Sequence, residues 1–478
     1  MAGAQLMHGP SSASFSPSTK SPEINLRYLW LIAFVAALGG LLFGYDWVVI
    51  GGAKDFYQAY FHLSTEVQVG WANSCALIGC FMGSLAGGRL SDYLGRRRVL
   101  LISGLLFAVS SVLTGWSHEF SDFIMWRIVG GVAIGLASNV SPTYLAEISP
   151  AQWRGRLVSL NQLALVIGIL LAQIVNWGIA RRVPPGVTVA TLTASWNVQF
   201  GWRWMFTAVA IPSLIFLIAT PFIPESPRWL VARGQADNAA LVLTRIGGAS
   251  YSRLELEAIQ SSLPGAAEEV PWSAVLRGRV FRLLLVGIAL AVLQQGSGIN
   301  ILFNYAEDIY RSAGYGMNEI LFNIVITGAI NLIFTVLAML LVDKFGRRRL
   351  MLCGCLAIGI CHIAASIAYR LHLHGFWILG VTLTAIACYA MTLAPITWVL
   401  ITEIFPNRYR GTAVSISVAT LWIASFGLTY TFPALQSAIG SSGTFLVYAG
   451  ICFAGALFVL LAVPETRGRS LESIGAES

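Results

Sequence analysis

The chain contains Gln294-Gln295-Gly296-Ser297-Gly298-Ile299-Asn300 within an apolar segment that runs from about 281 to 310. A helix of that length can cross a bilayer. Amides inside a bilayer need partners, because each unsatisfied polar group costs several kcal/mol. Uncharged amides suit a neutral solute rich in hydroxyl groups, and the glycines allow the helix to bend or open. The stretch therefore predicts a polar cavity within a helical membrane protein.

The composition extends this prediction to the whole chain. The chain is 56% hydrophobic and 11% charged, with a mean hydropathy of +0.72, whereas soluble domains carry about 25% charged residues. We expect an all-α membrane protein with twelve transmembrane helices. The apolar runs lie at about 29–50, 68–90, 98–116, 122–145, 157–180, 202–223, 281–310, 320–342, 349–370, 374–402, 412–436 and 443–463.

The net charge of +8 follows the expected topology. Most of the 30 lysine and arginine residues fall on one side of the spans, and the positive-inside rule places that side, with both termini, in the cytoplasm. No face free of the membrane is left for a nucleic acid, so we expect the partners to be the lipid bilayer and a solute. The seven cysteines fall in predicted spans and are interpreted as packing residues.

Three motifs occur twice in the same order. The paired positions are Asp92 with Asp343, Gly95 with Gly346, Arg96 with Arg347, Glu147 with Glu403 and Arg154 with Arg410. The offset is 251 residues for the first three pairs and 256 for the last two. A third echo relates Pro224-Glu225-Ser226 to Pro464-Glu465-Thr466. Ordered repeats of this kind predict two six-helix halves related as parallel repeats.

The domain organisation follows from these repeats. We expect a disordered cytoplasmic N-terminus at 1–27, six-helix bundles at 28–223 and 280–463, a cytoplasmic helical linker at 224–279 and a tail at 464–478. Within the linker, 235–243 and 254–262 look helical, with Gly247 and Gly248 between them. The linker has no glycine-rich nucleotide loop, so ATP-driven transport is not supported.

These motifs carry a family resemblance. From Leu29 to Leu471 the chain resembles the sugar porter family of the major facilitator superfamily and, within it, the bacterial proton-coupled xylose transporters. Besides the doubled motifs, the resemblance rests on Pro224-Glu225-Ser226-Pro227-Arg228, the Gln294–Asn300 stretch and Pro464-Glu465-Thr466. It implies two six-helix bundles, a central sugar site and alternating access. We expect the chain to function as a monomer.

An acid lies well inside the first span, at Asp46. Such a carboxylate needs a partner or a proton, and Arg127 in the fourth span is the candidate partner. Paired with Arg127, the carboxylate stays charged; parted from it, the carboxylate takes up a proton. Proton-coupled sugar porters have an acid at this position, so the resemblance implies proton coupling through Asp46 and Arg127. The alternative is a static structural ion pair.

The resemblance also implies a sugar site built from amide and indole side chains. These are Gln162, Gln294, Gln295, Asn300, Asn331, Trp398 and Trp422. Any one amide could instead form a helix-to-helix hydrogen bond, worth about 0.6 kcal/mol on average in membranes. Asn304 stands where a tyrosine is usual, Leu421 replaces a sugar-contacting glutamine, and Leu393-Ala394-Pro395 replaces a glycine-bearing sequence. These departures leave the identity of the sugar open.

Charged residues gather at the expected cytoplasmic ends of the spans. We expect a cytoplasmic gate formed by Asp92, Arg96, Glu147, Arg154, Glu225, Asp343, Arg347, Glu403 and Arg410. A network that joins the two halves in one state and separates in the other biases the equilibrium between them. We expect it to stabilise the outward-facing form. The alternative is a role in topology and folding stability.

The sequence thus favours a proton-coupled symporter of a monosaccharide, a xylose-like pentose or hexose, in the inner or plasma membrane. The alternatives are a passive sugar facilitator, a proton symporter of another polyol-like solute and, more remotely, a non-transporting sugar sensor. An enzyme is not expected. The histidines lack metal-ligand spacing such as His-Glu-x-x-His, so neither a metal nor a cofactor is expected.

Overall fold

The computed structural model of the protein describes residues 24–183, 189–262, 276, 278–373, 375–405 and 409–463. The expected tail and most of the expected disordered N-terminus therefore lie outside the described residues. Within these ranges every regular element is a helix, and eleven helices are long and apolar enough to cross a membrane. The last of them contains two such segments, because it turns at Gly440 (φ 71°). The expected twelve transmembrane helices are thus confirmed.

The first half of the bundle follows the first six predicted spans. Its five long helices are α1 (Leu26–Tyr60), α2 (Glu66–Leu94), α3 (Arg96–Gly115), α4 (Phe120–Ile148) and α5 (Ala151–Ile179). The sixth span is built from a π-helical turn η1 (Asn197–Gly201), α7 (Trp202–Thr207), α8 (Ala210–Ala219) and a 3-10 turn η2 (Thr220–Phe222), after the short α6 (Val189–Thr193).

The second half contains the remaining six spans. Its helices are α12 (Gly278–Gly296), α13 (Ile299–Asn304), α14 (Ala306–Ser312), α15 (Met317–Phe345), α16 (Arg347–Arg370), α17 (Phe376–Met391), α18 (Leu393–Glu403) and α19 (Arg410–Ala462). Spans expected as continuous helices at 281–310 and 374–402 are interrupted. The first opens after Gly296, where Gly298 adopts φ 79°, and the second breaks at Thr392.

Small residues let the helices of the first half approach closely. A Cβ atom added to Gly131 of α4 would lie 1.9 Å from the carbonyl oxygen of Ala76 in α2. One added to Gly44 of α1 would lie 1.9 Å from the carbonyl oxygen of Leu165 in α5. In a membrane, where apolar burial between helices gives little driving force, such close van der Waals packing replaces it. These glycines hold α2 against α4 and α1 against α5.

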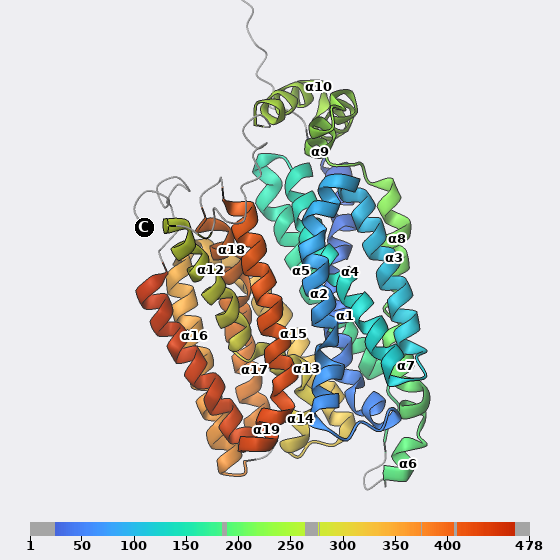
Figure 1. The fold of residues 1–478 in the computed structure, drawn as a ribbon, viewed down its shortest axis with the longest axis vertical. Coiled ribbons are helices and arrows are strands. Elements are labelled where there is room, and N and C mark those ends of the chain that lie inside the picture. The colour runs from blue at the N-terminus through green and yellow to red at the C-terminus, as the bar shows by residue number, and fades with distance from the viewer. Residues whose placement is uncertain are drawn as a thin grey trace, which may run out of the picture.

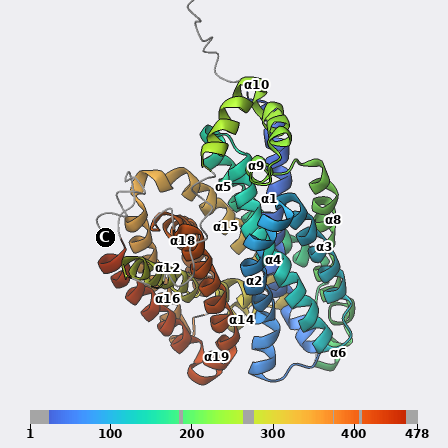
Figure 2. The same ribbon diagram turned by 45° about the horizontal axis from the view of Figure 1, so that its top comes forward.

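The two halves lie side by side, with α1–α8 on the right and α12–α19 on the left of Figure 1. Helix α2 packs against α19 and α5 packs against α15, so these four helices form the boundary between the halves, as Figure 2 also shows. Ring contacts cross the same boundary, for example between Trp71 and Phe426 at 6.1 Å.

The linker helices lie beyond one end of the first half (Figure 1). Helix α9 (Pro227–Ala232) was not expected, whereas α10 (Ala236–Ser262) contains both predicted linker helices and bends where predicted, at Gly247 and Gly248. Residues 263–275 of the linker lie outside the described ranges. We call the end of the bundle that carries α9 and α10 the linker end, and the end that carries α6 and α14 the far end.

Candidate functional site

Asp46 and Arg127 meet inside the first half. The Nη1 atom of Arg127 lies 2.9 Å from Oδ1 of Asp46, and the side chains are only 2% and 5% exposed. Asp46 comes from the middle of α1 and Arg127 from α4. The structure therefore places against Asp46 the partner expected from the sequence.

The environment of this pair leaves one carboxylate oxygen of Asp46 without a hydrogen-bond partner among the described residues. The Oδ2 atom of Asp46 is buried and has no hydrogen-bond partner among the described residues. Gly130, one turn after Arg127, leaves space beside it, since an added Cβ would lie 3.2 Å from Oδ2. The Arg127 guanidinium also lies 5.4 Å from the ring centre of Phe206, where a cation is attracted to the aromatic face. One oxygen is thus held by a cation while the other can accept a proton.

The amides of the seventh span form a buried group. The Nδ2 atom of Asn300 donates to Oε1 of Gln295 and, across to α19, to Oγ of Ser425 at 2.7 Å. The Nε2 atom of Gln295 donates to Oε1 of Gln294 at 3.4 Å. Three amides and a hydroxyl of this kind offer donors and acceptors to a hydroxyl-rich solute.

This amide group lies where the helix opens. A break in a transmembrane helix frees backbone groups, which neighbouring side chains must satisfy. His362 of α16, only 1% exposed, donates from Nε2 to the carbonyl oxygen of Ser297 at 2.8 Å. The ring of Tyr448 packs over Gly298. The glycines predicted the opening, but the sequence did not single out His362 as its stabiliser.

The remaining predicted sugar contacts come from α5, α15, α18 and α19. Trp422 of α19 lies with its ring centre 5.9 Å from that of Phe43 in α1, and its Nε1 is buried with no hydrogen-bond partner among the described residues. Asn331 is buried, and Gln162 and Trp398 are half-buried. Hydrogen bonds within the described residues do not join these last three side chains to the amide group.

The departures noted in the sequence lie in this region. Asn304 is buried, and its Oδ1 lacks a hydrogen-bond partner in the described part of the chain. The neighbouring Tyr305 donates its hydroxyl to the carbonyl oxygen of Thr429 at 2.8 Å, and its ring lies 4.4 Å from that of Phe432. Leu421 is buried beside Trp422. Two of the changed residues, Asn304 and Leu421, are thus buried side chains of the second half.

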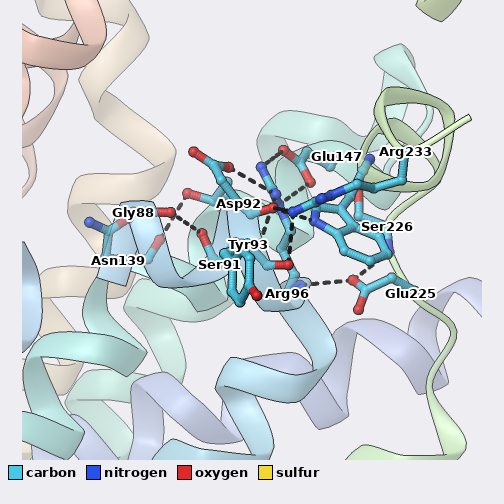
Figure 3. Close-up of polar contacts among 12 residues, drawn as sticks. Gly88, Ser91, Asp92, Tyr93, Arg96, Asn139, Glu147, Glu225, Ser226 and Arg233 are labelled. Atoms are coloured by element: carbon cyan, nitrogen blue, oxygen red, sulfur yellow. Dashed lines mark hydrogen bonds and ion pairs between the residues drawn. The ribbon is translucent and has the colours of Figure 1, made fainter. Parts of the chain in front are cut away.

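Four of the five predicted gate residues of the first half, Asp92, Arg96, Glu147 and Glu225, form a linker-end network, shown in Figure 3. Arg96 contacts Asp92 (Nη1 to Oδ1, 3.0 Å) and Glu147 (Nε to Oε2, 2.9 Å). The linker joins the network, because Trp229 Nε1 and Arg233 Nη2 donate to the carbonyl oxygen of Asp92 at 2.8 and 2.9 Å. All of these residues belong to the first half and its linker.

Glu225 contributes to this network as a helix cap. Its Oε1 accepts the backbone N–H groups of Arg96 at 2.9 Å and Arg97 at 3.2 Å, at the first turn of α3 (Figure 3). The first N–H groups of a helix have no partner within it, and a carboxylate there also interacts favourably with the helix dipole. Glu225 therefore fixes the start of the linker to the start of α3.

The second half repeats part of this arrangement. Arg347 Nε lies 3.8 Å from Oε2 of Glu403, the counterparts of Arg96 and Glu147. The side chains of Asp343 and Arg410 lie outside what the structure describes. Arg154 is exposed, and its Nε donates to the carbonyl oxygen of Ala146 at 3.1 Å. The ion pairs described at the linker end, Arg96 with Asp92 and Glu147 and Arg347 with Glu403, each lie within one half.

At the far end, by contrast, charged residues do join the two halves. Lys54 of α1 pairs with Asp308 of α14, and Asp55 of α1 pairs with Arg311 of α14. Glu307 lies among them. We call Lys54, Asp55, Glu307, Asp308 and Arg311 the far-end cluster. The sequence analysis did not identify this cluster. The available signals were the acids Glu307 and Asp308 within the apolar run at 281–310, and the adjacent Lys54 and Asp55 after the run at 29–50.

Comparison with known proteins agrees with this architecture. A family model described as "Sugar (and other) transporter" matches residues 32–477. The chain belongs to this family. It is 35% identical to the D-xylose-proton symporter of Escherichia coli strain K12, over 95% of this chain and 96% of that protein. It is 36% identical to the arabinose-proton symporter of Bacillus subtilis strain 168, over 96% of each.

Solved structures of this sugar transporter family have the same fold. The xylose transporter XylE from E. coli, in a partially occluded inward open conformation, superimposes with a TM-score of 0.82 at 35% identity, covering 93% of this chain and 100% of that one. The expected major facilitator fold is thereby confirmed.

Proposed function

We propose that this transporter carries a monosaccharide, a xylose-like pentose or hexose, together with a proton across the cytoplasmic membrane by alternating access. The observation that carries the proposal is the buried ion pair of Asp46 and Arg127, with one carboxylate oxygen unpartnered. The names of the D-xylose-proton and arabinose-proton symporters support it.

The geometry of the pair suits reversible proton binding. With Arg127 in contact, Asp46 stays ionised, because the cation offsets the loss of hydration. If the movement of α1 against α4 draws the two apart, an ionised carboxylate in apolar surroundings becomes unfavourable, and Asp46 takes up a proton. The protonation state then depends on the arrangement of the helices, which proton coupling requires.

The sugar site of this proposal lies between the halves. The amides Gln294, Gln295 and Asn300 bind hydroxyl groups, and Trp422 offers an apolar face and a free N–H donor. Gln162, Asn331 and Trp398 complete the site. Because Trp422 already contacts Phe43 of the opposite half, a sugar held there is positioned where a relative movement of the halves changes its access.

The domains and their orientation belong to the same proposal. The bundles at 28–223 and 280–463 act as the moving units, and the linker at 224–279 and both chain termini lie in the cytoplasm. The linker end then faces the cytoplasm and the far end faces outward. The linker-end network, with Arg154, Asp343, Arg347, Glu403 and Arg410, forms the cytoplasmic gate. The transporter works as a monomer in the bilayer, without a cofactor and without chemical conversion of the sugar.

The test uses purified protein in liposomes. Uptake of labelled D-xylose, L-arabinose, D-glucose and myo-inositol is followed with the outside more acidic than the inside, and again after a protonophore removes the gradient. We expect at least one of the three monosaccharides to accumulate above its outside concentration only while the gradient exists, whereas accumulation of myo-inositol alone would identify a polyol symporter. Equilibration that ignores the pH gradient would instead identify a passive facilitator, and absence of uptake of every sugar would contradict the proposed substrate class.

A further inference from the structure

The far-end cluster joins the two halves through two ion pairs. In one pair the cation comes from α1, and in the other it comes from α14. On α1 a cation, Lys54, precedes an anion, Asp55; on α14 an anion, Asp308, precedes a cation, Arg311. Lys54 pairs with Asp308 and Asp55 with Arg311, so each pair crosses from one half to the other. The far end is therefore held closed by charge complementarity between α1 and α14.

Glu307 adds a third carboxylate to this interface. Its side chain is 0% exposed. Its Oε2 accepts the backbone N–H of Asp55 at 3.2 Å. Its Oε1 lies 3.5 Å from Nη2 of Arg311, the same nitrogen that forms the ion pair with Asp55. Glu307 thus lies between the helices, and among the described residues it shares the two nearby cations, Lys54 and Arg311, with the acids that they pair with.

The charges of the cluster do not balance. It contains the three carboxylates of Asp55, Glu307 and Asp308 but only two cations. Arg311 is 47% exposed, so water screens part of its charge. Among the described residues, the phenol of Tyr57 on α1 interacts with Glu307, and the phenol of Tyr305, which follows α13, lies beside Lys54; neither supplies a positive charge. A buried excess negative charge is unfavourable unless a proton neutralises it.

We propose that Glu307 is a proton-binding site that completes the closed far end of the transporter. This inference rests on the proposed function only in that alternating access must separate α1 from α14. The proton comes from water at the far face, forms an O–H bond with a Glu307 carboxylate oxygen, and returns to that water when the halves separate. Lys54 lies about 12 Å along α1 from Asp46, at 1.5 Å per residue, so this site is distinct from the Asp46 carboxylate.

The sign of the pH effect follows from linkage. Water hydrates Glu307 when the halves separate at the far end, whereas the closed form surrounds it with protein. The closed form therefore binds the proton more tightly than the open form, and a lower pH shifts the equilibrium towards closure. Closure of the far end should be favoured by acid on that side.

Hydrogen exchange of the full chain in phospholipid nanodiscs tests this site. Exchange is measured without sugar at about pH 5.5 and about pH 8, so that the effect of proton binding on closure is compared over a wide range of pH, and corrected for the intrinsic effect of pH. We expect peptides covering 54–60 and Ala306–Ser312 to exchange more slowly at the lower pH. Glu307→Gln should exchange slowly at both pH values, so that the difference is lost. Glu119→Gln, an exposed acid on the loop between α3 and α4, should keep it.

Two further variants keep the result decisive. Asp308→Asn also removes one negative charge from the cluster and should likewise lose the pH difference, even if Glu307→Gln fails to fold. Asp46→Asn should keep it, so that failure of the proposed coupling and failure of this site are distinguishable. The inference would be overturned if the wild type exchanged equally at both pH values. It would also be overturned if Glu307→Gln or Asp308→Asn showed the same difference in exchange between the two pH values as the wild type. Loss of the difference in Asp46→Asn would assign the proton to Asp46 instead.

Discussion

The Glu225 carboxylate accepts the backbone N–H of Arg96 at 2.9 Å, which ties the residue after the sixth span to the first turn of α3. Loss of a capping side chain costs about 0.5–2 kcal/mol. Glu225→Ala should therefore lower the Tm of the detergent-solubilised protein. Glu119 is the matched control, because it occupies the N-cap of α4 without making a capping hydrogen bond. Equal Tm values for Glu225→Ala and Glu119→Ala would contradict this role.

Close packing of α2 against α4 gives a second prediction about stability. A methyl group at Gly131 would meet the Ala76 carbonyl oxygen at 1.9 Å, and overpacking of this kind costs about 1–3 kcal/mol. Gly131→Ala should denature at a clearly lower temperature than the wild type. Gly178→Ala, where no atom lies within 4 Å of the added methyl group, should leave the Tm nearly unchanged. A Gly131→Ala protein as stable as Gly178→Ala would show that the helices are not held this closely.

The hydrogen bonds of Asn300 predict its contribution to sugar binding. Asn300→Ala removes the donor shared by Gln295 and Ser425 and a group proposed to bind a sugar hydroxyl. An unsatisfied buried partner costs about 1–3 kcal/mol, so we expect sugar to bind at least about fivefold more weakly in isothermal titration calorimetry. Asn238 is an exposed residue of the linker, and Asn238→Ala provides the control. Wild-type affinity in folded Asn300→Ala protein would place the sugar elsewhere.

The position of Arg154 predicts that its replacement changes the rate of sugar transport without changing the affinity for sugar. In this structure its side chain is exposed and donates to the carbonyl oxygen of Ala146. Under the proposed gate it pairs across the halves only when the linker end closes. A loss of about 1 kcal/mol from that state changes its population about fivefold, so Arg154→Ala should slow sugar exchange in liposomes by a similar factor. Arg156→Ala, whose guanidinium stacks on Trp153, should exchange at the wild-type rate. Equal rates for both variants would favour a role in topology or folding.

Much of the fold could be predicted because the relevant information is local or repeated. Apolar run length predicted the twelve spans, and the equal spacing of the doubled motifs is reflected in the contact of Arg347 with Glu403, which parallels that of Arg96 with Glu147. The glycines beside Gln295 anticipated the opening of the seventh span. Asp46 could be paired with Arg127 because few charges lie deep in the spans.

What the sequence did not predict depends on contacts between distant segments. Lys54 and Asp308 are 254 residues apart, and only the packing of α1 against α14 brings them together. His362 lies in a different span from the Ser297 carbonyl group that it satisfies, and no local pattern links the two. The break at Thr392 was also unforeseen, since the sequence there has lost the glycine expected from its relatives.

The central claim is that Asp46 carries the coupled proton, and Asp46→Asn tests it most directly. The amide keeps the shape of the side chain but cannot exchange a proton, and it removes the charge that Arg127 holds at 2.9 Å. The measurement compares, in liposomes with an acidic exterior, accumulation of the labelled sugar with its exchange in the absence of a gradient. We predict that the variant still exchanges sugar but no longer concentrates it. Accumulation of sugar against its gradient by Asp46→Asn would contradict the account.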